Sequence, residues 1–147
     1  MVDYPDPQRA AFRAFSQYQT RWRDNDAYGH MNNVVYYEYF DTVVNRWLIE
    51  SGALEVPGGP IVGLVAETSC SFRASVGFPE TVEIGLVASH VGRSSVIYGL
   101  GLFGNGEAAA AAVCRYVHVY VDSSTRKPVV LPDLLRKTLA NIAAEIA

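Results

Sequence analysis

Residues 21–37 read RWRDNDAYGHMNNVVYY, and they mark the point where a strand gives way to a long helix. Before them, apolar and polar side chains alternate from Phe12 to Trp22, which is the period of two expected for a half-buried strand. The run from Asp24 to Gly29 is rich in turn-forming residues and ends that strand. We therefore predict a strand, a tight turn and a helix N-terminus within this stretch.

The longest helical pattern of the chain follows the turn, over residues 32–51. Either Asn32 or Asn33 can cap its start, and Gly52 suits the left-handed conformation that often follows a last helical turn. Apolar side chains recur at three- and four-residue steps and form a broad, aromatic face: Val35, Tyr36, Tyr39, Phe40, Val43, Val44, Trp47 and Leu48. Such a helix is expected to be buried against a sheet.

Four further strands are predicted at residues 66–76, 81–89, 96–102 and 113–121. Their short spacing favours antiparallel hairpins, because parallel crossovers need a dozen or more residues. A last helix is expected from about Pro132, with the apolar residues Leu134, Leu135, Leu139, Ile142 and Ile146. The order β-α-β-β-β-β-α predicts one α+β domain over residues 1–147, with residues 1–11 as a loose N-terminal arm. Its five-stranded antiparallel sheet would wrap around the long helix.

Length and composition narrow the class of protein. The chain has 147 residues, is 50% hydrophobic and carries a formal net charge of -3. One domain of this size can bury a core, and its low positive charge argues against non-specific nucleic-acid binding. We expect no signal peptide, since a basic start and an apolar run are missing, and no apolar stretch long enough to span a bilayer. The only two cysteines, Cys70 and Cys114, suit a reducing compartment, so we expect a cytoplasmic protein.

The turn before the long helix holds the residues best suited to chemistry, namely Asp24, Asp26 and His30. The free amides of a helix N-terminus can bind an anion or a developing oxyanion. A carboxylate nearby can attack a carbonyl or activate a water molecule. These residues therefore fit the hydrolysis of an activated acyl group. Asp and Asn also occupy turns and helix starts for local hydrogen bonding alone, which is the competing interpretation.

Metal sites fit this segment poorly. Asp24 and Asp26 begin like a calcium-binding EF-hand loop, but its twelfth position, where a Glu is required, is Val35. A zinc site lacks ligands at suitable spacing, because the three histidines are far apart in sequence: His30, His90 and His118.

The glycines from Gly99 to Gly104 match the dinucleotide-binding pattern GxGxxG. Asn105 and Gly106, however, would break the helix that must follow, and the residues left before the next strand are too few for a crossover. We therefore predict a glycine-containing strand, an Asn-Gly turn and a strand of small residues.

Residues 24–36 resemble the 4-hydroxybenzoyl-CoA thioesterase family of hotdog-fold acyl-CoA thioesterases. The family pattern Asp-x-Asp-x-x-Gly-His-x-Asn-Asn-x-x-Tyr is complete here, as Asp24, Asp26, Gly29, His30, Asn32, Asn33 and Tyr36. The resemblance covers most of the chain, and residues 91–95 are similar to a Gly-x-Ser-Ser turn of the family. One departure is residues 72–75, Phe-Arg-Ala-Ser, where the family often has Tyr-x-x-Pro.

The resemblance implies hydrolysis of an acyl-CoA to a carboxylic acid and free coenzyme A, without a metal or other cofactor. Asp26 would be the catalytic carboxylate, as nucleophile or as general base for water. Amides near Asn33 would polarise the thioester carbonyl, and His30 and Tyr36 would shape or orient the site. Asp24 would support the turn.

The same resemblance implies a substrate groove between subunits, and hence a homodimer or homotetramer. Phosphates of coenzyme A need positive charge and turn amides. Arg93 with Ser94 and Ser95 is the first choice for this role, and other arginines could add to it: Arg73, Arg115 or Arg126.

Two questions stay open at the level of sequence. A non-catalytic module that binds acyl-CoA or an acyl carrier on the same fold is an alternative, because a fold does not fix function. Glu67, on the polar side of its predicted strand, either assists catalysis or is a surface residue. A dehydratase of the same fold is disfavoured, since no HxxxxG-like motif lies near the helix.

Overall fold

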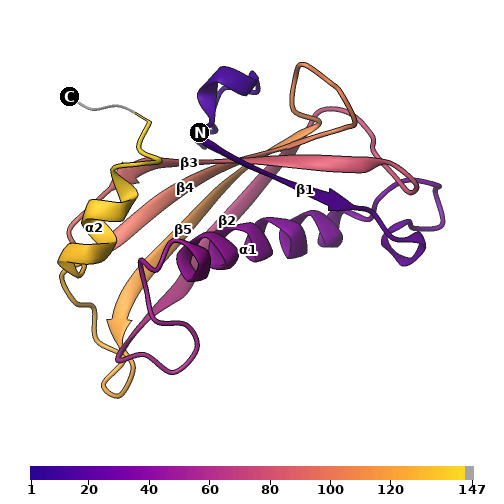
Figure 1. Ribbon diagram of the computed structural model, residues 1–147. Helices are drawn as coiled ribbons and strands as arrows, with labels where there is room; N and C mark the ends of the chain where they lie inside the picture. The colour runs from indigo at the N-terminus through magenta and orange to yellow at the C-terminus, as the bar shows by residue number, and fades with distance from the viewer. Residues whose placement is uncertain (145–147) are drawn as a thin grey trace.

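The computed structural model describes residues 1–144 and contains a five-stranded antiparallel sheet with a long helix along one face (Figure 1). The strand order is β1-β3-β4-β5-β2, so β1 and β2 form the two edges. The predicted hotdog arrangement is confirmed. The elements are β1 (Ala14–Gln19), η2 (Trp22–Asp24), α1 (Asn33–Glu50), β2 (Ile61–Phe72), β3 (Thr81–Val91), β4 (Ser95–Phe103), β5 (Ala112–Asp122) and α2 (Asp133–Leu139).

Helix α1 begins and ends close to the residues predicted. Asn32 is the N-cap, and its side-chain oxygen accepts a hydrogen bond from the N–H of Val34 at 3.1 Å. Gly52 follows the helix with a φ of 71°. The helix buries six side chains against the concave face of the sheet: Tyr36, Tyr39, Phe40, Val43, Val44 and Leu48. Burial of this aromatic face fixes the distance between the helix and the sheet.

Strand β2 differs from the prediction at both ends, because it runs from Ile61 to Phe72 instead of over residues 66–76. Its first residues read Ile-Val-Gly-Leu-Val-Ala and show no alternation, so a period-two pattern cannot find them. A register shift between Val65 and Glu67 then changes which side chains face the helix. The strand ends where the N–H groups of Arg73 and Ala74 both donate to the carbonyl of Ala111.

The N-terminal segment covers part of the outer, convex face of the sheet. Residues 1–11, expected as a loose arm, contain the short 3-10 turn η1 (Arg9–Ala11). Phe12 is only 4% exposed and packs edge-on against the ring of Phe103 at 5.8 Å between centroids. Gly85 and Gly101 leave room for it, since a Cβ at either position would lie 2.6 Å from the Phe12 ring.

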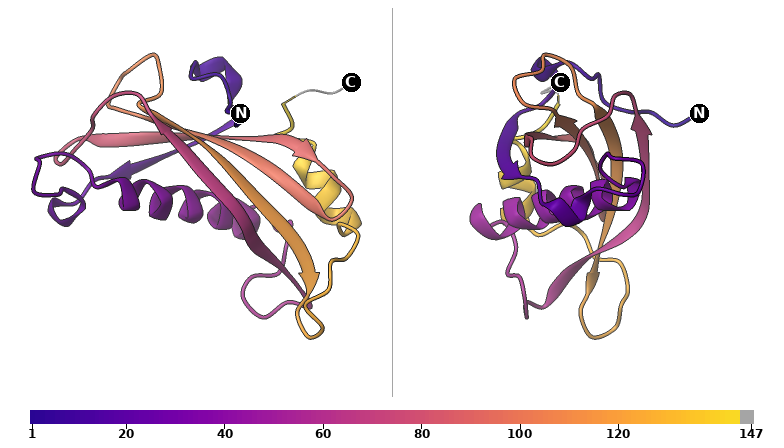
Figure 2. Two further views of the ribbon diagram at one scale, coloured as in Figure 1. Left: turned by 180° about the vertical axis from the view of Figure 1, so that it is seen from behind. Right: turned by 90° about the vertical axis from the view of Figure 1, so that its right-hand side faces the viewer.

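The glycines of residues 99–104 therefore serve packing. Gly99 and Gly101 lie within β4, and the chain turns at Asn105 and Gly106 before β5, as predicted. The C-terminal segment after α2 continues the β1 edge, because the N–H of Ala88 donates to Ile142 and that of Ala144 donates to Ala88. Figure 2 shows α2 at the end of the sheet where β3 finishes. Ile146 lies outside the described residues.

Candidate active site

The motif residues form a closed loop between η2 and α1. The N–H of Asp26 donates to the carbonyl of His30 at 2.9 Å, and the N–H of Gly29 donates back to Asp26 at 3.2 Å. Gly29 has a φ of 84°, a left-handed conformation that glycine adopts at little cost. The N–H of Asn32 closes the loop on the carbonyl of Asp24 at 2.9 Å. The sequence pattern thus encodes a compact turn that presents its side chains next to the helix N-terminus.

A second segment supports this loop from the side. The side-chain oxygen of Asn25 accepts a hydrogen bond from the N–H of Phe78 at 3.0 Å, and the N–H of Met31 donates to Val76 at 2.8 Å. Gly77 packs closely against Asn25, since a Cβ there would lie 3.1 Å from the Asn25 oxygen. Residues 76–78 therefore hold the loop at the end of the sheet where β3 begins.

Asp26 keeps part of its carboxylate available. One oxygen, Oδ1, accepts a hydrogen bond from the N–H of Tyr28 at 2.8 Å, which orients the group. The other, Oδ2, lies 3.8 Å from Nδ1 of His30, and the Asp26 side chain is 20% exposed. His30 is more open, with 48% of its side chain exposed. The pair can therefore reach a substrate or a water molecule while the backbone holds both residues in place.

The start of α1 supplies an unbonded amide one residue after the loop closes at Asn32. Asn32 caps Val34 with its side chain and Val35 with its carbonyl, at 3.1 and 2.9 Å. The N–H of Asn33 makes no hydrogen bond to any of the described residues 1–144. An exposed helix N-terminal amide is a suitable donor to a developing oxyanion.

Tyr36 lies below the surface of the site. It is 4% exposed, and its ring packs edge-on against Phe72 at 5.0 Å between centroids. Burial raises the pKa of its hydroxyl to about 12, so the group stays protonated. Tyr36 therefore shapes the wall between α1 and the end of β2.

Asp24, by contrast with Asp26, is 1% exposed and bound to Arg21 and Tyr39. The sequence gives no direct sign of this cluster. Tyr39 belongs to the regular apolar pattern of the helix, which indicates core, and Arg21 to the polar face of a predicted strand. Only the fold brings these three residues together.

The predicted phosphate-binding turn lies at the other end of the sheet. The carbonyls of Arg93 and Ser94 accept hydrogen bonds from Leu131 and Tyr120, and the N–H of Gly92 donates to Ser95. β4 spans eight residue steps from Ser95 to Phe103, which is about 26 Å at a rise of about 3.3 Å per residue. Phe103 pairs with β3 near its start, close to the motif loop. The β3–β4 turn and the loop before α1 lie at opposite ends of the sheet (Figure 1), so one protomer does not bring Arg93, Ser94 and Ser95 next to Asp26.

The other candidate charges are separated too. Glu67 is 62% exposed on the outer face of β2, and its carboxylate pairs with Arg115 at 2.9 Å. Arg73 lines a cleft near the motif loop together with Glu80 and Glu107. Arg126 follows β5, at the end of the sheet near residues 92–95.

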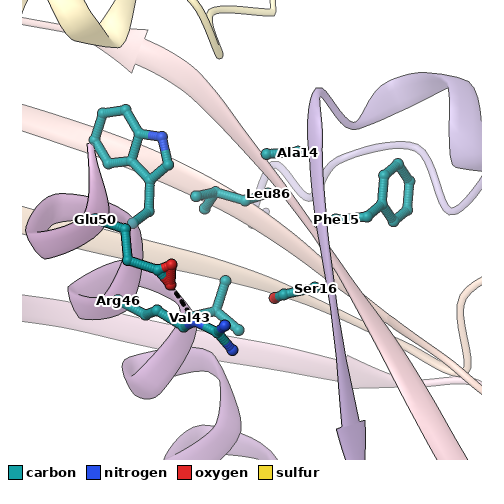
Figure 3. Close-up of a pocket in the computed structure, with 8 residues that line it drawn as sticks. Ala14, Phe15, Ser16, Val43, Arg46, Glu50 and Leu86 are labelled. Carbon is teal, nitrogen blue, oxygen red and sulfur yellow. Dashed lines mark hydrogen bonds and ion pairs between the residues drawn. The ribbon is translucent and has the colours of Figure 1, made fainter.

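A cavity of about 200 Å³ lies between β1 and α1 (Figure 3). Its walls are mainly apolar, with Phe15 and Trp47 among them, and the ion pair of Arg46 with Glu50 lines one side. None of the motif residues lines it. Within residues 1–144, no three His, Cys, Asp or Glu side chains gather closely enough to hold a metal ion, and no helix is long and apolar enough to cross a membrane.

Residues 20–139, which include the whole motif loop, α1 and the strands β2 to β5, match the Thioesterase-like superfamily. The chain belongs to this family. The narrower resemblance to 4-hydroxybenzoyl-CoA thioesterases stays a prediction. Membership in the thioesterase-like family indicates a hydrolase that acts on thioesters.

Solved structures agree with this assignment. A protein from Pseudomonas aeruginosa strain PAO1 is 47% identical, with 95% of this chain and 97% of that chain covered and a TM-score of 0.90. A thioesterase from Thermus thermophilus, solved with coenzyme A and Zn, is 25% identical over 90% and 95% of the two chains, with a TM-score of 0.75. A 1,4-dihydroxy-2-naphthoyl-CoA thioesterase from Synechocystis shares the fold, at 15% identity, 86% and 94% coverage and a TM-score of 0.78. No curated protein matches the sequence.

Proposed function

We propose that the protein hydrolyses an acyl-CoA to a carboxylic acid and free coenzyme A, with Asp26 as the catalytic carboxylate. The observation that carries the proposal is the partly exposed Asp26 carboxylate in a closed loop that leads directly into the helix start with the open amide of Asn33. Asp26 either attacks the thioester carbon itself, forming a mixed anhydride that water then hydrolyses to the free acid, or removes a proton from the attacking water. The Asn33 amide stabilises the negative charge that builds on the carbonyl oxygen, and the thiolate of coenzyme A leaves.

A pair of chains would complete the site. Within residues 1–144, β2 pairs only with β5 and its other edge is open, with Leu64 and Val65 40% and 49% exposed. An unpaired apolar edge strand is a template for pairing with another chain. Antiparallel pairing of two β2 strands about a two-fold axis reverses one sheet relative to the other. It would bring Arg93, Ser94 and Ser95 of the second copy to the Asp26 end of the first.

This arrangement would place the phosphates of coenzyme A on one subunit and the thioester on the other. The complex of the Thermus relative with coenzyme A supports a CoA substrate for the family. His30 and Tyr36 would orient and enclose the acyl end. We propose that the reaction needs no metal, since Asp26 and the helix amide supply the base or nucleophile and the oxyanion donor.

We also propose a cytoplasmic location. Cys70 and Cys114 stand opposite each other on β2 and β5, and both are free. Burial raises the pKa of Cys70 to about 12, so its thiol stays protonated and is a poor nucleophile. Two free cysteines at neighbouring positions fit a reducing compartment.

Thiol release from a panel of acyl-CoAs tests the proposal. We expect wild type to release thiol above background, with and without EDTA, and Asp26→Asn to be at least about 100-fold slower. Asp6→Asn is the matched control, because Asp6 also accepts a backbone hydrogen bond from the residue two positions on, at 2.9 Å, but lies in the N-terminal arm. Binding of acyl-CoA by wild type without thiol release would favour the non-catalytic module. An Asp26→Asn variant as fast as wild type would refute the mechanism.

A further inference from the structure

Asp24 is the one carboxylate among the described residues that is buried, at 1% exposure. Burying a charge is costly unless it is paired and hydrogen-bonded. A turn could be capped by an exposed Asp or Asn at much lower cost. The burial of this group therefore calls for a role beyond the turn itself.

Four donors surround the Asp24 carboxylate. The hydroxyl of Tyr39 donates to Oδ2 at 2.6 Å, and the backbone N–H of Arg21 donates to the same oxygen at 2.8 Å. The Arg21 guanidinium binds Oδ1 through Nη2 at 2.9 Å and Nε at 3.1 Å. Burial opposes ionisation of Asp24, but the hydrogen bonds from Tyr39 and Arg21 outweigh it and hold its pKa below the ordinary value. Burial and the same hydrogen bond raise the pKa of Tyr39 to about 12, which keeps its hydroxyl a donor.

Asp24 joins the loop to α1 through two hydrogen bonds, at two positions along the helix. The carbonyl of Asp24 accepts the N–H of Asn32, the N-cap, and its side chain accepts the hydroxyl of Tyr39. Asn32 and Tyr39 are seven residues apart, or about 10 Å along a helix axis. Two attachments at different heights fix the direction of the loop as well as its distance from the helix. Asp26 follows two residues later and is closed onto His30.

We propose that Asp24, held by Arg21 and Tyr39, is a positioning residue for the hydrolysis proposed above, on which this inference rests. It sets where the Asp26 carboxylate lies relative to the Asn33 amide. Displacement of a reacting group by about 1 Å can cost about 100-fold in rate, so a loosened loop lowers turnover without removing any group that touches the substrate.

Tyr39→Phe tests the proposal with the smallest change, since it removes one hydroxyl and leaves the ring in the core. We expect kcat to fall roughly tenfold with KM within about twofold, because the loss acts on geometry at the reacting centre. Tyr18→Phe is the matched control. Its ring packs on that of Tyr39 at 5.8 Å between centroids, but its hydroxyl does not contact Asp24. We expect Tyr18→Phe to keep the wild-type kcat.

Amide hydrogen exchange provides a readout that does not depend on activity. The N–H groups of Asp26 and Asn32 are hydrogen-bonded within the loop, and we expect both to exchange faster in Tyr39→Phe and at the wild-type rate in Tyr18→Phe. A Tyr39→Phe variant that is less stable but keeps wild-type kcat would overturn the proposal, as would unchanged exchange at these two amides. If wild type hydrolyses no acyl-CoA, the proposed function fails, and the exchange data alone decide whether Asp24 holds the loop.

Discussion

The buried histidine of β5 gives the chain a specific dependence of stability on pH. His118 is 2% exposed, with Nε2 3.3 Å from the hydroxyl of Tyr116 and Nδ1 3.0 Å from that of Tyr120. The Tyr116 hydroxyl donates to Asp41 at 2.5 Å, so its oxygen accepts from Nε2–H of the imidazole. Nδ1 then accepts from Tyr120. The neutral imidazole therefore has a hydrogen-bond partner at each ring nitrogen.

Burial lowers the pKa of His118 to about 4, against 6.5 for the ordinary side chain. As the pH falls below 6.5, the unfolded chain takes up a proton at this residue and the folded chain does not. The stability that the neutral imidazole contributes is therefore complete above pH 6.5 and is lost as the pH falls towards 4. The linkage relation gives a decrease in the free energy of unfolding of about 2 kcal/mol between pH 7 and pH 5.

Urea unfolding at pH 7 and pH 5 measures this decrease. We expect wild type to lose about 2 kcal/mol more than His118→Gln, which cannot titrate but keeps a donor and an acceptor. His90→Gln is the matched control, because His90 is exposed on β3, and it should retain the wild-type decrease. Equal decreases in wild type and His118→Gln would refute the assignment of a buried neutral imidazole.

Three further predictions concern the elements that frame the site. Asn32→Ala removes the side-chain cap of Val34 and should lower the free energy of unfolding by about 1 kcal/mol in urea melts, whereas no change would show the cap to be dispensable. Gly101→Ala places a Cβ 2.6 Å from the Phe12 ring and should cost about 1–3 kcal/mol in thermal unfolding. The cost should shrink in a Phe12→Ala background, and full additivity would contradict the contact. Val65→Asp puts a charge on the open edge of β2 and should give monomers in sedimentation, where an unchanged mass would exclude β2 pairing.

Local patterns are sufficient to predict most of the architecture. Alternation locates β3 and β4, β-branched and aromatic residues locate β5, and the asparagines and Gly52 bound α1, because these signals depend on neighbours in sequence. The start of β2 escapes prediction, since a continuous apolar run has no period to detect. The sequence also predicts which residues lie in the motif turn, and the fold places Asp26 beside His30.

What the sequence could not predict depends on distant contacts. Tyr39 has the same helical spacing as its core neighbours, so its hydrogen bond to Asp24 cannot be read from the pattern. The separation of Arg93 from Asp26 follows from strand direction and length, which a motif does not express. A site formed between two chains is likewise absent from the pattern of one.

Single-turnover thiol release with enzyme in excess tests the central claim most directly, because it isolates the chemical step from product release. Wild type and Asp26→Asn would be mixed with an acyl-CoA that wild type cleaves, and the affinity for that substrate measured separately by calorimetry. We predict a rate at least about 100-fold lower in Asp26→Asn, with a dissociation constant within about threefold of wild type. Equal rates in the two proteins would contradict a catalytic role for Asp26.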